Sequence, residues 1–189
     1  MPDLAFDHFY DHDELTRFVR AWADERPRIV TVESIGDSWE GRAIWLVTLT
    51  NEDTGPALEK PALLVEGNIH SVEWTGSTAA LHVIQRLASG FGDDERITRL
   101  LDTRCVYMIP RSNPDGAEHA LREGRPIRSS VRPFPHATRQ PGLHMEDVDG
   151  DRRTLFMRLL DPNGPWKPHP DEPRLLVARD PDEATLRSR

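Results

Sequence analysis

Residues 61–87 limit the possible fold more than any other part of this 189-residue chain. Four consecutive apolar residues at 62–65 predict a short buried strand, and Gly67-Asn68 provides turn chemistry directly after it. Beyond the turn, apolar residues recur with the spacing of one helical face, at Ala80, Val83, Ile84 and Leu87. A strand that leads into a helix is the building unit of α/β proteins, so we expect a sheet with helices packed on its faces.

Two side chains of metal-binding type, His70 and Glu73, lie between this strand and this helix. Side chains at the carboxyl end of a strand converge on a crevice, where an imidazole and a carboxylate three residues apart can hold one metal ion. The spacing by itself is not selective, because His8 with Asp11 and His144 with Asp147 repeat it. A surface or hydrogen-bonded histidine is therefore the competing interpretation of His70.

The remaining elements predict a sheet of mixed direction. Residues 10–27 have the pattern of an amphipathic helix with Asp11 or Asp13 as its cap, and residues 29–50 that of an antiparallel hairpin. A short helix at 95–101 and a strand at 105–109 follow. We expect the sheet to end at this last strand with an uncovered edge. From Arg111 onward the proline content predicts a loop-rich, extended continuation.

Composition restricts the classes of partner. The chain has 24 basic and 32 acidic residues and a formal net charge of −8, which argues against nucleic acids and anionic membranes as partners. No apolar stretch is long enough to span a bilayer, and the acidic first residues differ from a signal peptide. We therefore expect a cytoplasmic protein whose substrates are small molecules or peptides.

Several segments resemble the zinc metallocarboxypeptidases, the carboxypeptidase A-like family, and they occur in the family's order: SIGDSWEGRAIW, GNIHSVEW and NPDG. The resemblance implies the N-terminal half of a mixed-sheet, three-layer α/β sandwich. It also implies zinc bound by His70 and Glu73, and a peptide substrate that loses its C-terminal residue. In the family, an arginine after NPDG stabilises the oxyanion. Arg128 and Arg132 match it, and we favour Arg132 because prolines follow it.

The resemblance stops short of a complete active site. The family's third zinc ligand, a histidine, and its downstream tyrosine and general-base glutamate have no counterpart here, and Gly164 stands where a substrate-binding arginine is required. We expect residues 1–126 to form part of a catalytic domain and residues 127–189 a proline-rich continuation with a disordered tail. The chain should be a truncated, inactive carboxypeptidase, or alternatively a non-catalytic binding module. The alternating acids Asp147, Asp149 and Asp151 predict a capped turn rather than a cation site.

Overall fold

A computed structural model of the protein describes residues 4–124, 127–132, 138, 141–142, 144, 146–151 and 158–180. The chain divides into two compact units, Met1–Met145 and Glu146–Arg189. The predicted domain boundary at residue 126 stays a prediction. None of the described helices has the length and apolar character needed to cross a membrane.

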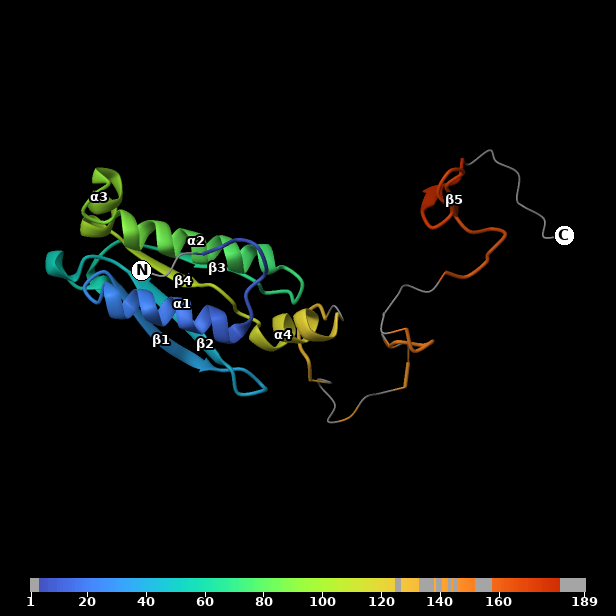
Figure 1. Ribbon diagram of the computed structural model, residues 1–189, viewed down its shortest axis with the longest axis horizontal. Coiled ribbons are helices and arrows are strands. Elements are labelled where there is room, and N and C mark those ends of the chain that lie inside the picture. The colour runs from blue at the N-terminus through green and yellow to red at the C-terminus, as the bar shows by residue number, and fades with distance from the viewer. Residues whose placement is uncertain are drawn as a thin grey trace. The chain divides into compact units, whose positions relative to one another are not determined.

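The first unit contains a four-stranded mixed sheet (Figure 1). Its helices and strands are α1 (His12–Glu25), β1 (Val30–Asp37), β2 (Ala43–Leu49), β3 (Ala62–Glu66), α2 (Trp74–Gly90), α3 (Glu95–Thr103), β4 (Cys105–Ile109) and α4 (Pro114–Glu123), with short 3-10 turns at Glu52–Thr54 and Ala57–Glu59. The strand order is β1-β2-β4-β3, in which only β3 and β4 run parallel. This arrangement confirms the predicted α/β class and the predicted hairpin.

Helix α1 begins where its sequence predicts, and the buried face of α2 differs slightly from the predicted one. Asp11 is the N-cap of α1, and Asp11 and Glu14 form a reciprocal capping box. In α2, Ala80, Ile84 and Leu87 are buried as expected, but Val83 is 40% exposed and Leu81 takes its place in the core. The buried face of α2 is therefore rotated slightly from the predicted one. It also includes Ser77, Leu81 and Ala88.

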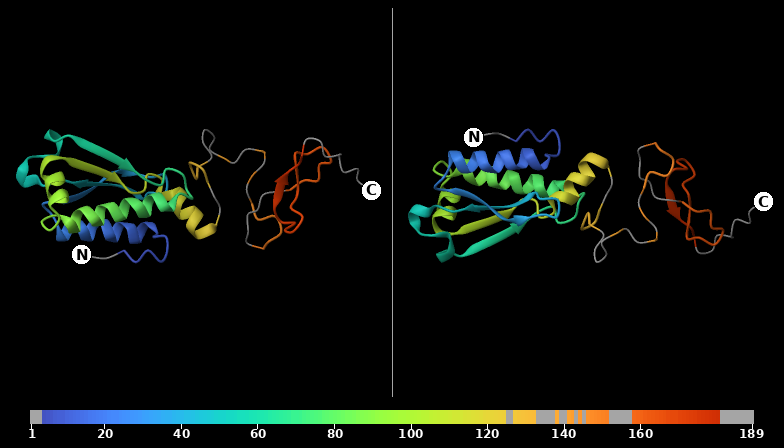
Figure 2. Two further views of the ribbon diagram at one scale, coloured as in Figure 1. Left: turned by 90° about the horizontal axis from the view of Figure 1, so that it is seen from above. Right: turned by 90° about the horizontal axis from the view of Figure 1, so that it is seen from below.

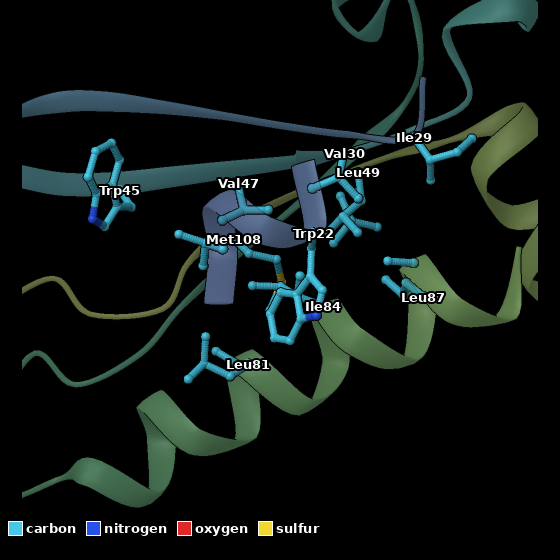
Figure 3. Close-up of a cluster of buried hydrophobic side chains, with 14 of the residues drawn as sticks. Trp22, Ile29, Val30, Trp45, Val47, Leu49, Leu81, Ile84, Leu87 and Met108 are labelled. Atoms are coloured by element: carbon cyan, nitrogen blue, oxygen red, sulfur yellow. The ribbon is translucent and has the colours of Figure 1, made fainter. Parts of the chain in front are cut away.

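Both long helices pack on the same face of the sheet, which Figure 2 shows from two sides. Figure 3 shows the core between them, where Trp22 of α1 and Ile84 of α2 lie near Met108 of β4. Most of β1 and β3 stays exposed to solvent. Of the three predicted layers, the described residues thus supply the sheet and one helical layer.

The position of β3 corrects two expectations. β4 inserts between β2 and β3, so β3 and not the Cys105 strand forms the edge. Strand β3 was also predicted to be buried. Its residues Leu63 and Leu64, whose side chains lie on opposite faces of the sheet, are instead 60% and 58% exposed. An edge strand lacks a neighbour on one side, and a continuous apolar run gives no sign of that.

The segment after β4 corrects a third expectation. The chain was predicted to be loop-rich and extended from Arg111 onward, but Asn-Pro-Asp-Gly begins α4. Asn113 is the N-cap, its side chain accepts a hydrogen bond from the Gly116 amide, and Pro114 occupies the first helical position. Asparagine and proline favour both turns and helix starts, so the motif alone did not separate the two.

The second unit contains one regular feature among its described residues. β5 (Trp166–Pro168) and β6 (Leu176–Ala178) form a short antiparallel pair, which the sequence interpretation missed. Asp147 and Asp149 accept hydrogen bonds from the amides of Gly150 and Asp151, and the three aspartates are exposed. This agrees with the predicted capped turn. The end of the predicted tail, residues 181–189, lies outside the described residues.

Candidate metal centre

His70 and Glu73 bring two potential ligand atoms together directly after β3. His70 Nδ1 lies 2.8 Å from Glu73 Oε1. Two atoms that each lie about 2.0–2.2 Å from one zinc ion are separated by roughly 3 Å, so this spacing fits a shared metal. The hydrogen bond with His70 is the main cause that lowers the pKa of the Glu73 carboxyl, and the charge of Arg128 acts in the same direction. Glu73 is therefore ionised at neutral pH, as a ligand must be.

The backbone that carries these side chains is fixed by the parallel pairing of β3 and β4. The Gly67 amide donates to the Ile109 carbonyl at 2.9 Å, and the Gly67 carbonyl accepts from the Ser112 amide at 3.0 Å. A Cβ atom on Gly67 would lie 2.9 Å from the Gly76 carbonyl oxygen and 3.1 Å from that of Pro110. Only glycine allows the start of α2 and the end of β4 to approach this closely.

Asn68 is the second residue of the turn between β3 and the His70 loop. Its backbone is left-handed, with φ of 54°, and its side chain is 3% exposed. The side-chain amide donates to the His70 carbonyl at 2.7 Å. Asparagine adopts this conformation more readily than most residues, since its short polar side chain forms hydrogen bonds locally. The Gly67-Asn68 turn predicted from sequence is thus the feature that orients His70.

The two arginines named from sequence lie in different places. Arg128 directly follows Ile127, whose amide donates a hydrogen bond at 2.8 Å to the hydroxyl of Ser71, a residue of the loop that carries His70 and Glu73. The Arg132 guanidinium carbon instead lies 5.4 Å from the centre of the Trp39 ring. Trp39 and Arg132 line a hollow of about 480 Å³ together with Asn113. The structure therefore brings Arg128 toward the His70–Glu73 pair and places Arg132, the residue favoured from sequence, beside the β1–β2 turn.

A third protein ligand for this pair is absent from the described part of the chain. The His, Cys, Asp and Glu side chains there form a group of three with metal-like spacing only at Asp147, Asp149 and Asp151, in the second unit. The donor set at His70 and Glu73 therefore fits zinc as two of the three protein ligands that a catalytic site generally has.

Two buried charges near the site were missed from the sequence. Arg111 and Glu118 are 3% and 1% exposed, and their charged groups are 3.4 Å apart. Arg111 also donates to the Tyr10 carbonyl at 2.7 Å, and burial lowers its pKa to about 10. A helical interpretation of 114–123 would have placed Glu118 on the same face as Pro114 and Asp115, one turn earlier, and both of these residues are buried.

The structure thus combines an α/β fold with a mixed sheet and a candidate metal centre, in which a histidine and a carboxylate converge after a parallel strand. The family profile described as zinc carboxypeptidase matches residues 15–170. The chain belongs to the zinc carboxypeptidase family.

Individual relatives match part of the chain. Carboxypeptidase D of Mus musculus is 36% identical over 134 residues, which cover 63% of this chain and 10% of that protein. Carboxypeptidase A2 of Rattus norvegicus is 31% identical over 114 residues, which cover 60% of this chain and 26% of the relative. The chain thus spans about a quarter or less of the length of these curated relatives.

Solved structures agree on the fold. Carboxypeptidase A from Helicoverpa armigera superimposes with a TM-score of 0.60 at 26% identity, covering 69% of this chain and 31% of that one. Thrombin-activatable fibrinolysis inhibitor gives a TM-score of 0.59 at 19% identity, with 67% and 31% covered. Both confirm that this chain has an incomplete carboxypeptidase-type α/β fold.

Proposed function

We propose that this chain supplies the first part of a zinc-dependent carboxypeptidase site, which removes C-terminal residues from peptides. The observation that carries the proposal is the 2.8 Å approach of His70 Nδ1 to Glu73 Oε1 at the carboxyl end of β3. His70 and Glu73 are the proposed zinc ligands. Family membership supports zinc and a peptide substrate as the chemistry of this pair.

Each residue has a defined task in this proposal. Zinc, when bound, would polarise the scissile carbonyl and lower the pKa of a bound water molecule. His70 presents Nδ1 toward Glu73, and the ionised Glu73 carboxylate would provide negative charge to a bound ion. We assign Arg128 rather than Arg132 to the developing oxyanion, because the segment that carries Arg128 is hydrogen-bonded to Ser71 in the loop of the proposed ligands. A fixed positive charge at that point stabilises the tetrahedral intermediate more than the substrate.

We infer that neither Asp115 nor Glu66 replaces the family's general base. Both carboxylate oxygens of Asp115 accept hydrogen bonds, from Ser38, the Glu40 amide and Arg42. Glu66 is exposed at the end of the edge strand. General-base catalysis is typically worth about 10²–10⁴-fold in rate, so we infer that the chain alone does not turn over peptides.

A non-catalytic binding module is the second candidate function. The observation that favours it is that no described His, Cys, Asp or Glu joins His70 and Glu73 as a third ligand. Such a module would hold peptides or a weakly bound ion without hydrolysis. A histidine supplied by further chain would favour the enzyme, and specific peptide binding without zinc would favour the module.

Zinc titration of the purified chain by calorimetry tests the proposed site. The unaltered chain should bind one zinc ion weakly, because two protein ligands leave the remaining coordination to water. His70→Ala and Glu73→Gln should each abolish this binding. His8→Ala is the matched control, since His8 and Asp11 repeat the spacing at another exposed position. Stoichiometric binding that survives His70→Ala would show that the ion binds elsewhere.

A further inference from the structure

The segment that carries Arg128 is held on one side by Ser71. The Ile127 amide donates to Ser71 Oγ at 2.8 Å, and the Ser71 amide donates to the Ile127 carbonyl at 3.3 Å. Ser71 is fully buried and stands between His70 and Glu73 in the sequence. The residue before Arg128 is thus hydrogen-bonded twice to the loop that carries the proposed ligands.

On its other side the same segment is held by Asn113. The Asn113 side-chain Nδ2 donates to the Ser129 carbonyl and, at 3.2 Å, to the Ile69 carbonyl. The opposite atom of the same side chain, Oδ1, caps α4 through the Gly116 amide at 2.9 Å. One amide group therefore connects the Arg128 segment, the His70 loop and the start of α4.

These contacts fix the residues on both sides of Arg128. Backbone bonds at Ile127 and Ser129 remove most of the freedom of the residue between them, which otherwise lies on an exposed segment. Fixing one residue's backbone costs roughly 1–2 kcal/mol of conformational entropy, which folding supplies before a substrate arrives. A charge held in place in advance stabilises an oxyanion without reorganisation during the reaction.

We propose that Ser71 and Asn113 are positioning residues that hold Arg128 beside the His70–Glu73 pair, at a distance set by the shared loop. This inference rests on the proposed function, in which Arg128 contacts the oxyanion. Because Ser71 lies between the two ligand residues, a shift of the metal loop carries Arg128 with it. The proposed ligands and the proposed oxyanion arginine therefore move together.

Three single substitutions in the full chain separate positioning from general stability. Ser71→Ala removes the acceptor of the Ile127 amide. Asn113→Asp keeps the oxygen that caps α4 but removes both side-chain donors. Ser77→Ala is the matched control, because Ser77 is also buried and its hydroxyl makes no hydrogen bond with any described residue.

The first measurement is residue-resolved amide hydrogen exchange. Ser71→Ala should reduce the protection of the Ile127 amide by about tenfold, the loss expected for one hydrogen bond, with α2 and the sheet unchanged. Ser77→Ala should leave Ile127 unchanged. Protection at Ile127 that persists in Ser71→Ala would overturn the proposal.

The second measurement is the affinity of a zinc-loaded chain for a phosphonate dipeptide, whose tetrahedral oxygens resemble the oxyanion. Arg128→Gln should weaken binding by about 10- to 100-fold, the range for a charged hydrogen bond. Ser71→Ala and Asn113→Asp should weaken it severalfold in the unaltered background. In a chain that already carries Arg128→Gln, neither Ser71→Ala nor Asn113→Asp should weaken phosphonate binding further, because both substitutions act through Arg128.

The outcomes distinguish the two proposals. Equal losses from Ser71→Ala with and without Arg128→Gln would show a structural role and contradict positioning. If the unaltered chain binds zinc but no phosphonate, the carboxypeptidase proposal fails, and the positioning role fails with it even if Ile127 loses protection in Ser71→Ala. Binding that depends on Arg128, with the exchange result as expected, supports both.

Discussion

Arg42 Nη1 donates a hydrogen bond to Asp115 Oδ1 at 2.6 Å and so connects the β1–β2 turn to the first turn of α4. Asp115 is 4% exposed, and the Ser38 hydroxyl at 2.7 Å and the Glu40 amide at 2.9 Å complete its hydrogen bonds. Burial alone would raise the pKa of the Asp115 carboxyl, but these donors and the charge of Arg42 lower it below its usual value. Folding therefore favours the ionised carboxylate.

Asp115→Asn should destabilise the first unit by about 1.5–3 kcal/mol at pH 7, since hydrogen bonds to a charged group are lost. A carboxyl whose pKa is lowered on folding stabilises the protein above the unfolded value of about 3.9 and loses that contribution as the pH falls through the folded value. The difference from the unaltered chain should therefore shrink below about pH 4. Urea unfolding at several pH values measures it.

Asp53→Asn is the control for this substitution. Asp53 pairs with Arg28 at 3.0 Å, but both side chains are more than half exposed. Its loss should cost less than about 1 kcal/mol. A similar cost for both substitutions would contradict the structural importance of the Asp115 contacts.

Gly67→Ala should disrupt the turn before His70, whereas Gly76→Ala should be tolerated. The new Cβ at Gly67 would lie 2.9 Å from the Gly76 carbonyl oxygen, while one at Gly76 would lie 3.4 Å from the Asn68 amide. We expect a loss of about 1–3 kcal/mol for the first substitution and little change or a gain for the second, which is within a helix. Thermal unfolding and zinc affinity of both variants test this difference.

The exposed β3 edge should cause the chain to self-associate. An apolar edge strand offers unpaired backbone groups to a second molecule. Leu64→Lys should reduce association at micromolar concentration in sedimentation velocity, because a charge would have to be buried. Leu58→Lys is the control, since Leu58 is 91% exposed and lies outside the sheet. A strictly monomeric unaltered chain would contradict this prediction.

Peptidase activity of the chain alone should be undetectable with zinc present. The site has two proposed ligands and a proposed oxyanion arginine, but no third ligand joins His70 and Glu73 among the described residues. Release of C-terminal residues from a panel of short peptides measures the activity. Turnover that disappears in both His70→Ala and Glu73→Gln would show that another acid of the chain acts as the base.

The sequence predicted those parts of the fold that depend on neighbouring residues. The Asp11 cap, the hairpin of β1 and β2, and the turn at Gly67-Asn68 all follow from local chemistry. The edge position of β3 did not, because β4 reaches its place between β2 and β3 only after a long connection. Strand order depends on pairing between distant segments, which no local pattern records.

The candidate site shows the same division. The approach of His70 to Glu73 follows from a strand, a turn and a helix in succession, although zinc binding there stays a prediction. The choice between Arg128 and Arg132 depends on Ser71, which binds the Ile127 amide across 56 positions of sequence. The prolines that favoured Arg132 indicate a loop, but they carry no information about which neighbour the loop contacts.

A hydrogen bond between α1 and α4 has a consequence for the order of folding during synthesis. The Glu118 carboxylate accepts from the His12 amide at 2.7 Å, and 106 positions separate the two residues. Translation adds about 5–20 residues per second, so roughly 5–20 s pass between the synthesis of His12 and the synthesis of Glu118. The apolar face of α1 meanwhile lacks part of its partner surface, and such long-range contacts slow folding. Helix α1 should thus become fully ordered only after α4 has emerged.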